Sequence, residues 1–558
     1  MVHYGLRLMH PTNIHYSLIM SSNQIFSEER LLFTPSKSQS NAIRTIYAFP
    51  NDYNVGITSL GYQIIWASLA TRNDLQVSRL FTDIYEQLPN NPELVGFSVS
   101  WELDYINILN LLEFLKVPLR SNLRDNEHPI IFGGGAVLTA NPEPFADFFD
   151  VILLGDGENL IPNFIDTYQE VRGGDRTTKL KKLAQVPGIY VPSLYQVEYQ
   201  ELTGEIKSIN PINNDIPETV QKQTYQGNIL STSSVVTKNS AWPNIYMIEV
   251  VRSCPEMCRF CLASYVTLPF RTANLQSSLI PAIETGLKVT NRIGLLGASV
   301  TQHPEFEQLL DYLSQPQYDH VKLSVSSVRT NTVTVKLAEI LAKRDSRSIT
   351  IAVESGSEKM RQMINKKLEN DEIIQCAINA KKGGLTGLKL YGMVGLPGEE
   401  MEDLEQTVMM MKNIKKTVPG LRLTLGCSTF VPKAHTPFQW IGVHKEGEKR
   451  LQFLSKELKS KGMEFRPESY NWSVIQALIS RGDRRLSYIL ELTRKYGDSL
   501  GSYRRAFKDL KTQLPPLDFY VFQNWHQEQI LPWHHLKTAI SEDMLKKHYL
   551  GSILTIDK

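Results

Sequence analysis

The chain has 558 residues, of which 42% are hydrophobic and 21% are charged. This composition is typical of a folded protein and excludes a mostly disordered one. Its 60 lysines and arginines nearly balance 58 aspartates and glutamates, which excludes a strongly basic nucleic-acid module for the whole chain but leaves a local patch open. No apolar run approaches about 18 residues. The N-terminal sequence also lacks a secretory pattern, so we expect no membrane contact. The five cysteines are too few for a disulfide scaffold and fit a reducing, cytoplasmic location.

A series of alternating strand and helix patterns begins near residue 44 and follows an N-terminal segment, residues 1–43. Strands are predicted at 44–50, 94–99, 129–132 and 150–154, and helices at 60–71 and 105–115. Glycine-rich loops, including 133–135 and 155–158, follow the last two of these strands. This order predicts an α/β domain over residues 44–195 with an open, doubly wound, Rossmann-like parallel sheet. Such sheets bind ligands at the carboxyl ends of their strands.

A connector and a second alternating series follow. Residues 196–243 are rich in Asn, Gln, Ser and Thr, and we interpret them as a linker with a small hairpin. Strands are then predicted at 245–251, 292–296, 321–326, 348–353, 388–394 and 422–430, separated by helical segments. Six such units over residues 244–440 predict a parallel α/β barrel or partial TIM barrel. Residues 441–558 are predicted to be a helical region that caps the barrel mouth.

Three of the five cysteines share one short segment. Cys254, Cys258 and Cys261 have the spacing C-x3-C-x2-C just after the first strand of the second series. Three thiolates on one loop can bind three irons of a [4Fe–4S] cube and leave the fourth iron open to another ligand. The alternative is a structural zinc site, which usually has four protein ligands. Cys376 and Cys427 are predicted to be core residues, with an orientation toward the barrel cavity as the alternative for Cys427.

The segment from Arg252 to Cys261, with Phe260 before the last cysteine, resembles the radical S-adenosylmethionine (SAM) superfamily. The resemblance implies that the amino and carboxylate groups of SAM bind the open iron. It also implies that an electron from the cluster cleaves SAM to methionine and a 5′-deoxyadenosyl radical. A flavodoxin- or ferredoxin-type protein is then expected as the electron donor. In such enzymes the cofactor carries the chemistry and the protein supplies position and exclusion of water.

Further segments of the barrel are similar to family motifs and imply SAM-binding residues. These residues are Phe260, Gly297, Ser299, Ser326, Glu354, Gly395, Pro397 and Val431. The family often has Gly-Gly-Glu where this chain has Gly-Ala-Ser at 297–299, which puts a role for Gly297 and Ser299 in doubt. The carboxylate of Glu354 can accept hydrogen bonds from ribose or from the SAM amino group, and its alternative is a helix cap. His435 is either an acid–base group or a buried histidine.

The N-terminal sheet resembles the cobalamin-binding domains that precede some radical SAM barrels. The resemblance implies that cobalamin contacts Asn54, Ser98, Ser100, Gly134, Gly135, Gly155, Gly157 and Glu158. The sequence lacks the Asp-x-His-x-x-Gly motif with which many cobalamin proteins replace the lower cobalt ligand. Two alternatives remain: cobalamin binds without a histidine ligand, or the domain keeps the fold without the cofactor.

Together these resemblances imply a radical SAM enzyme that carries out cobalamin-dependent methylation or another modification at an unactivated carbon. They assign neither a substrate nor catalytic residues. The first alternative is modification of tRNA or another RNA, for which basic stretches at 456–461 and 504–511 lie among Trp472, Trp525 and Trp533. RNA methylthiotransferases carry additional N-terminal cysteines, whereas no cysteine precedes Cys254 here. The second alternative is a non-catalytic SAM or cobalamin scaffold or sensor.

Overall fold

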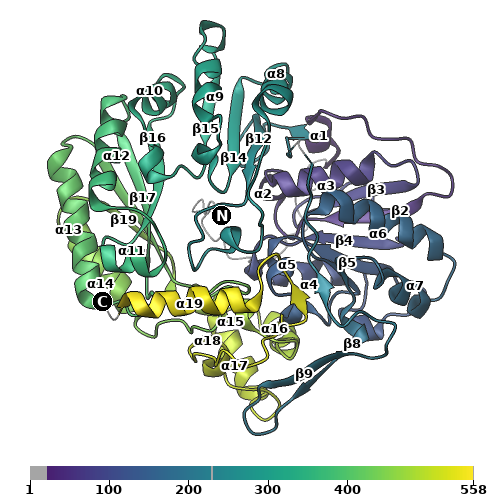
Figure 1. Cartoon of the computed structure of the whole chain (residues 1–558). Helices are drawn as coiled ribbons and strands as arrows, with labels where there is room; N and C mark the ends of the chain where they lie inside the picture. Colours follow the sequence, from purple (N-terminus) through teal and green to yellow (C-terminus); the bar gives the residue numbers. More distant parts are fainter. Residues whose placement is uncertain (1–21, 228–229, 557–558) are drawn as a thin grey trace.

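The computed structural model describes residues 22–227 and 230–556. An N-terminal α/β lobe and a barrel lobe lie side by side, and the C-terminal helices lie against both of them (Figure 1). Among the described residues, no helix combines the length and the apolar character needed to cross a membrane.

The N-terminal lobe is built on a six-stranded sheet with the order β3-β2-β4-β5-β6-β7. Its strands are β2 (Ile43–Ala48), β3 (Leu75–Leu80), β4 (Leu94–Ser98), β5 (Ile130–Gly134), β6 (Val151–Leu153) and β7 (Ile189–Tyr190). All neighbouring pairs are parallel except β6 and β7. The chain therefore reverses its direction of travel between β2 and β4, which is the topological switch point of a doubly wound sheet.

The predicted doubly wound fold is confirmed, but the sequence analysis missed strand β3. This strand carries Arg79 in the buried interior, which hides the apolar pattern of a strand. The guanidinium is neutralised there by Glu29 and Glu86, each with an N–O distance of 2.7 Å. A buried charge that is paired on both sides can occupy a core position that sequence patterns reserve for apolar residues.

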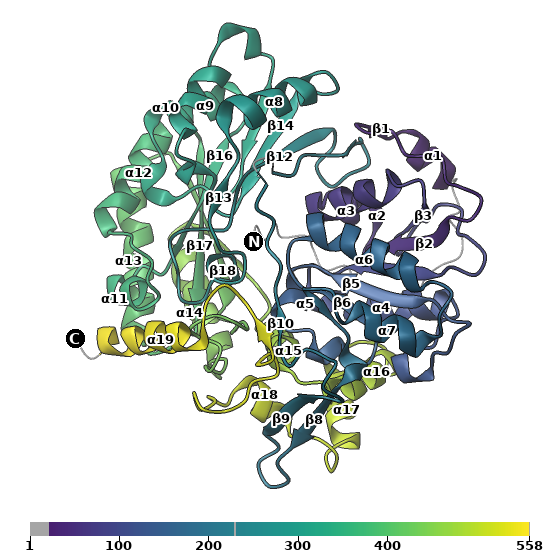
Figure 2. The same ribbon diagram turned by 45° about the vertical axis from the view of Figure 1, so that its right-hand side comes forward.

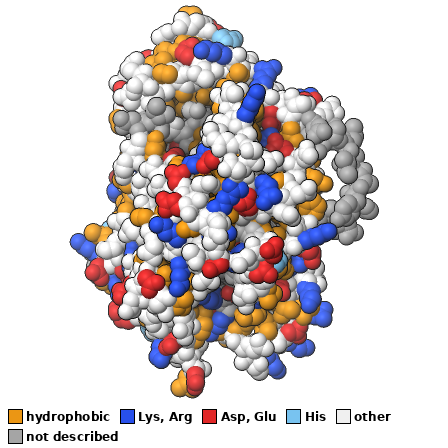
Figure 3. Space-filling view, turned by 90° about the vertical axis from the view of Figure 1, so that its right-hand side faces the viewer, with side chains coloured by type: hydrophobic (Ala, Val, Ile, Leu, Met, Phe, Trp, Pro, Cys, Tyr) orange, Lys and Arg blue, Asp and Glu red, His pale blue; other side chains and the backbone are white. Residues whose placement is uncertain are grey.

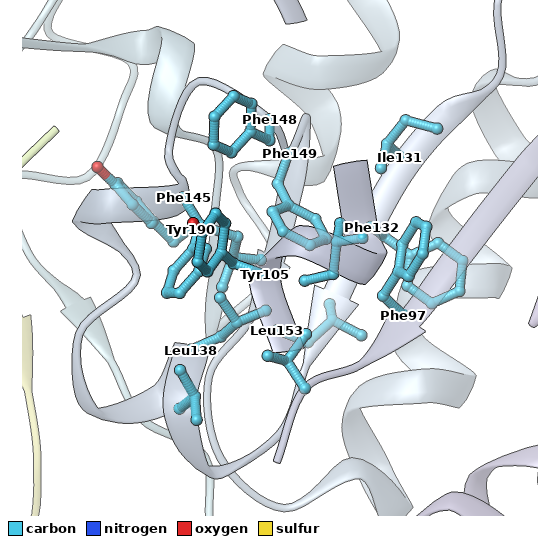
Figure 4. Packing of buried hydrophobic residues seen from close by; sticks show 14 of the residues in the cluster. Phe97, Tyr105, Ile131, Phe132, Leu138, Phe145, Phe148, Phe149, Leu153 and Tyr190 are labelled. Atoms are coloured by element: carbon cyan, nitrogen blue, oxygen red, sulfur yellow. The ribbon is translucent and has the colours of Figure 1, made fainter. Parts of the chain in front are cut away.

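Helices cover both faces of this sheet. Helices α3 (Leu60–Ala70) and α6 (Gly157–Val171) pack together, whereas α4 (Tyr105–Phe114) packs against α16 (Leu486–Lys495) of the C-terminal region. The core between the sheet and its covering segments is rich in aromatic rings (Figure 4). Phe97 and Phe149 meet edge to face at 5.9 Å between ring centroids, a favourable aromatic geometry.

The connector contains the predicted hairpin, formed by β8 (Tyr195–Tyr199) and β9 (Ile206–Pro211). Two further short strands tie the connector to distant parts of the chain. Strand β10 (Val220–Gln221) pairs with β20 (Leu536–Lys537), and β11 (Val235–Val236) pairs with β1 (Arg30–Leu31). The connector is therefore fastened to both ends of the chain.

The barrel lobe consists of two four-stranded sheets, β13-β12-β14-β15 and β16-β17-β18-β19. Their strands are β12 (Ile245–Arg252), β13 (Arg271–Thr272), β14 (Arg292–Gly297), β15 (Lys322–Val325), β16 (Ser348–Glu354), β17 (Gly387–Val394), β18 (Arg422–Thr429) and β19 (Glu464–Pro467). A parallel bridge between Val328 and Ile351 joins the two sheets. All other pairs are parallel except β12 with β13. The six predicted barrel strands are present, which confirms the partial barrel.

The C-terminal region contains a barrel strand that the sequence pattern did not indicate. Residues 441–558 were predicted to be helical, yet β19 lies within them and extends the barrel sheet beside β18. Four residues that include a glutamate, an arginine and a proline carry no periodic signal, and pairing with β18 defines this strand instead. The rest of the region is mainly helical: α14 (Gly447–Lys459), α15 (Tyr470–Arg481), α16, α17 (Leu500–Asp509), α18 (Leu517–Val521) and α19 (Glu542–Ile556).

The outer layer of the barrel is formed by helices that alternate with its strands (Figure 2). They include α8 (Ile280–Leu287), α9 (Phe306–Leu313), α10 (Val335–Lys343), α12 (Asn370–Lys382) and α13 (Met401–Thr417). In α9 the buried side chains are Phe306, Leu309, Leu310 and Leu313. This spacing forms one apolar stripe that faces the sheet.

Candidate functional site

The three cysteines lie on a tight loop directly after β12. Ser253 and Met257 in this loop have positive φ angles of 72° and 56°, which allow the chain to turn sharply around Cys254 and Cys258. The Ser253 hydroxyl donates to the Ala263 carbonyl at 3.0 Å, and the amide of Cys261 donates to the Cys258 carbonyl at 2.9 Å. Hydrogen bonds within the segment from Ser253 to Ala263 therefore hold the loop in a compact shape.

The thiols are close enough to affect one another's ionisation. The pKa of Cys258 is raised to about 12, mainly by burial; the positive charge of Lys366 opposes this rise, and the thiols of Cys261 and Cys254 contribute to it. Burial is also the main cause of the raised pKa of Cys254. Metal binding needs thiolates, so a bound metal must offset this cost.

A second segment holds the cysteine loop in place. It follows α11 (Glu358–Met363). The side-chain amide of Asn365 donates to the carbonyls of Met257 at 2.8 Å and Glu256 at 3.1 Å. The backbone amide of Arg259 donates to the Ile364 carbonyl at 2.9 Å. These bonds tie the loop to the far half of the barrel.

The chemistry of the donor set fits a [4Fe–4S] cluster with one open iron. The loop supplies three thiols, and the other two cysteines, Cys376 and Cys427, are buried in the hydrophobic core of the barrel. In the ranges that the structure describes, no three His, Cys, Asp or Glu side chains are grouped so as to hold one metal ion. A cubane takes one thiolate for each of three irons, so Cys254, Cys258 and Cys261 are the residues that would hold it.

Glu354 lies at the end of β16, on the same side of the barrel as the cysteine loop. Its φ angle is 66°, and its carboxylate pairs with the Lys366 ammonium at 3.1 Å. The helix-cap alternative is wrong, because the side chain of Ser357 caps the following helix α11. The positive charge of Lys366 also acts to lower the pKa of the Cys258 thiol. No sequence motif pointed to this lysine, which links a predicted SAM-binding carboxylate to a predicted cluster ligand.

Ser299 belongs to a polar chain that reaches the cysteine loop. Its hydroxyl donates to Gln302, and Gln302 in turn donates to the carboxylate of Glu256. Glu256 pairs with Arg329 at 2.9 Å. Ser326, at the end of β15, instead donates to the Leu295 carbonyl at 3.2 Å. The strand ends of β14 and β15 are thus connected to the loop between Cys254 and Cys258.

The structure gives packing roles to three of the remaining predicted SAM-binding residues, Gly297, Phe260 and Val431. A Cβ atom on Gly297 would lie 2.6 Å from the Val251 carbonyl oxygen, so this glycine is required where β14 approaches β12. Phe260 packs against an apolar cluster that includes Leu396 and Phe430. Pro397, the residue after Leu396, is half-buried. Val431 instead packs against the large apolar cluster that the N-terminal lobe shares with the C-terminal helices.

Gly395 contacts a buried ion pair, Glu399 with Arg450, which no sequence motif indicated. Its amide donates to the Glu399 carboxylate at 2.6 Å, and Glu399 pairs with Arg450 at 2.5 Å. Burial raises the pKa of Glu399 to about 7, against the opposing effects of Gly395 and Arg450. Sequence spacing gave no signal for the pair, because Arg450 comes from α14, 51 residues farther along the chain.

The switch point of the N-terminal sheet faces the barrel. Glu102, just beyond β4, forms a buried ion pair with Lys433, just beyond β18. Ser98 is buried at the end of β4, whereas Ser100 is exposed. The carbonyl of Asn54 accepts from the Ala241 amide at 3.0 Å. Asn54 follows β2, and Ser98 and Ser100 lie at and beyond the end of its parallel neighbour β4. Contact of these residues with cobalamin stays a prediction.

The glycines of this edge also have packing roles. A Cβ atom on Gly155 would lie 2.0 Å from the Gln223 carbonyl oxygen, and one on Gly135 would lie 2.4 Å from the Val99 carbonyl oxygen. Gly157 is similarly crowded by Ile65, whereas Gly134 has more room, with its nearest atom at 3.5 Å. Close packing explains three of these four glycines without a cofactor.

Glu158 pairs with Arg252 at 2.7 Å, directly before the cysteine loop. Asp156 pairs with Arg271 at 2.6 Å and with Arg252 at 3.3 Å. These ion pairs join the loop after β6 to β12. The predicted cobalamin residue Glu158 is therefore part of the contact between the two lobes.

Two other proposed roles can be compared with the structure. His435 is buried, which lowers its pKa to about 3, so it does not titrate near neutral pH. Trp525 and Trp533 are buried, and the Arg481 guanidinium lies 3.7 Å from the ring centroid of Trp525. These aromatic rings are not available to stack on RNA bases. The face in Figure 3 mixes acidic and basic side chains without a continuous basic patch.

Residues 248–411 match the family model described as radical SAM superfamily. Residues 79–192 match a second model, described as radical SAM proteins, N-terminal. An uncharacterized protein of Methanocaldococcus jannaschii is 28% identical over 449 residues, which are 80% of this chain and 90% of that protein.

Two named enzymes are more distantly similar. The tRNA-2-methylthio-N(6)-dimethylallyladenosine synthase of Rickettsia canadensis is 26% identical over 256 residues, 42% of this chain and 55% of that protein. This chain thus spans about half of that synthase. The solved structure of the cobalamin-dependent S-adenosylmethionine radical enzyme OxsB, with aqua-cobalamin and S-adenosylmethionine bound, is 12% identical with a TM-score of 0.44, and the match covers 92% of this chain and 79% of that chain. The family matches confirm the resemblance drawn from the cysteine motif: residues 248–411, which include Cys254, Cys258 and Cys261, form a radical SAM domain.

Proposed function

We propose that this chain is a radical SAM enzyme that modifies an unactivated carbon of its substrate with the help of cobalamin, methyl transfer being the natural case. When bound by Cys254, Cys258 and Cys261, the cluster supplies the electron that cleaves SAM to methionine and a 5′-deoxyadenosyl radical. The proposed radical SAM domain covers residues 244–440, and the proposed cobalamin domain covers residues 44–195. A reducing cytoplasmic location fits both proposed domains.

The observation that carries the proposal is the orientation of the two parallel sheets. Glu102 pairs with Lys433 and Glu158 pairs with Arg252, so the carboxyl ends of strands in both lobes face each other. Ligands bind at these ends in doubly wound sheets and in α/β barrels. A ligand at the switch point between β2 and β4 and a ligand on the barrel would therefore face each other.

The residues of this chain have separate tasks in the proposal. Glu354 and Lys366 place one negative and one positive charge beside Cys258, where they can orient the polar groups of SAM. The chain of Ser299, Gln302 and Glu256 fixes the other side of the loop.

The test uses protein that is purified and reconstituted with iron and sulfide without oxygen, then mixed with SAM and dithionite. The measurement is 5′-deoxyadenosine, with and without added cobalamin. The Cys254/Cys258/Cys261→Ala triple variant should lose the product, and the Cys376→Ala variant should keep it. Product that depends on cobalamin would support methyl transfer. No product from a SAM-binding cluster would contradict the proposal and favour a sensor or scaffold, and a product only in the presence of RNA would favour RNA modification.

A further inference from the structure

The inner face of the second barrel sheet is only partly covered. Helices α12 and α13 lie on the outer side of this sheet (Figures 1 and 2). Along β16 and β17, residues buried against these helices alternate with residues that are half-buried or exposed. The second set includes Thr350, Ala352 and Lys389, whereas a closed α/β barrel fills its interior with layers of bulky aliphatic side chains. The inner face of this sheet is therefore accessible to a ligand.

The inner stripe of β17, formed by Lys389, Tyr391 and Met393, changes from charged to apolar along the strand. These side chains share one face, because successive residues of a strand point to opposite sides. Lys389 is exposed, and the other two residues are half-buried. Met393 packs against the same apolar cluster as Phe260, the residue before Cys261. The stripe therefore leads from a charged position inside the barrel to the neighbourhood of the cysteine loop.

The charge of Lys389 is available to a ligand. Strand β17 lies between β16 and β18, so this lysine is not one of the charges that protect a sheet edge from other chains. Across the described part of the chain, no carboxylate forms an ion pair with its ammonium. The row of register partners runs from Lys389 through Thr424 to Glu464. Glu464 is already paired with Arg422 at 2.8 Å and with Arg466 at 2.5 Å, so this face keeps an excess of positive charge.

We propose that the inner stripe of β17 binds the substrate, and that this substrate is an amphiphile: Lys389 holds its carboxylate or phosphate, and Met393 contacts its hydrocarbon part. The proposal rests on the proposed function and adds the class of substrate. Met393 is four residues beyond Lys389, which is about 13 Å along a strand. An anionic group fixed by Lys389 places alkyl carbons about this far away beside Met393 and Phe260, next to the loop that would hold the cluster. Such carbons are unactivated, as the proposed chemistry requires.

The experiment measures binding to the reconstituted full-length protein by calorimetry and requires no turnover. The probes are decanoate and decyl phosphate, which distinguish a carboxylate from a phosphate, and decanol, which has the same chain without the charge. Each probe is kept below the concentration at which it aggregates. The test variants are Lys389→Met, Lys389→Arg and Met393→Ser. The matched controls are Lys416→Met and Met409→Ser, because both side chains are exposed on the outer helix α13.

We expect the wild type to bind at least one anionic probe tenfold or more tightly than decanol, and salt should reduce this preference. Lys389→Met should bind that probe no better than decanol, whereas Lys389→Arg keeps the charge and should retain the preference. Met393→Ser should weaken the binding of all three probes, and both controls should bind as the wild type does.

Equal binding of the anionic probes by the wild type and Lys389→Met would overturn the proposal, as would wild-type binding of decanol that is as tight as that of both anionic probes. Failure of the proposed function would be distinct. The wild type would then form no 5′-deoxyadenosine from SAM and dithionite, while its preference for an anionic probe would still depend on Lys389.

Discussion

Glu102 and Lys433 form a buried ion pair although they are 331 residues apart in the chain. The glutamate follows β4 of the N-terminal sheet, and the lysine follows β18 of the barrel. Helix α15 completes the arrangement, because Gln476 and Ser480 donate to the same carboxylate at 3.0 and 2.9 Å. Three regions of the chain therefore meet at one carboxylate, between the two proposed ligand sites.

Removing the lysine should destabilise this junction strongly. The Lys433→Met variant leaves Glu102 buried without its cation, and we expect a loss of about 3–5 kcal/mol in the free energy of unfolding. The exposed pair of Lys449 and Glu446 provides the control, since Lys449→Met should cost less than about 1 kcal/mol. Urea unfolding followed by fluorescence measures both. Equal effects of the two substitutions would show that Glu102 is not held by Lys433.

The sequence predicted the two sheets because their strands are apolar and recur with helices between them. It missed β3, where Arg79 is buried between two glutamates, and β19, where pairing with β18 replaces any periodic signal. Both failures have one physical cause. Contacts with residues far away in the sequence determine these strands, and a local pattern does not contain such contacts.

Asp104 should make stability depend on pH in the direction opposite to an ordinary carboxylate. Burial raises its pKa to about 7, and the charge of Glu102 adds to this effect, while a hydrogen bond from Asn51 opposes it. The neutral form is favoured in the folded state. The stability that this site contributes is therefore present at pH 4 and lost as the pH rises toward 7.

The Asp104→Asn variant mimics the neutral acid and keeps an oxygen that can accept from Asn51. Compared with the wild type, we expect similar stability near pH 4 and a gain of roughly 2–4 kcal/mol at pH 8. The measurement is urea unfolding of both proteins across this range. If the difference in stability between variant and wild type did not change with pH, the raised pKa of Asp104 would be ruled out. Other titrating groups, such as Glu399, are present in both proteins, so their contributions cancel in the difference.

Gly155 should not tolerate a side chain. The Gly155→Ala substitution would place a Cβ 2.0 Å from the Gln223 carbonyl oxygen at a φ of 115°, so the contact between β6 and the connector must shift. We expect a loss of about 1–3 kcal/mol or more. Gly61→Ala is the matched control, because Gly61 lies in α3 with nothing within 4 Å of the added atom, and it should stabilise by up to about 1 kcal/mol. Thermal unfolding distinguishes the two, and equal shifts would contradict the packing role.

The candidate site was predictable where its residues are adjacent in sequence and hidden where they are not. Cys254, Cys258 and Cys261 share one loop, so their spacing alone indicated a cluster. Lys366 acts on the same loop from the connection between α11 and α12. Glycine patterns were ambiguous for a different reason: a glycine needed for close packing, such as Gly155, has the same sequence appearance as one that contacts a cofactor.

Lys366 should affect the reduction potential of the reconstituted cluster. Its ammonium pairs with Glu354 at 3.1 Å and acts electrostatically on Cys258. A nearby positive charge stabilises the more negative, reduced form of a cluster. We therefore expect the Lys366→Met variant to have a lower potential than the wild type, and the Lys366→Arg variant to stay close to it. A redox titration followed by electron paramagnetic resonance measures the potentials without requiring turnover. A potential in Lys366→Met that equals the wild-type value would show that this lysine serves only to hold Glu354 in place.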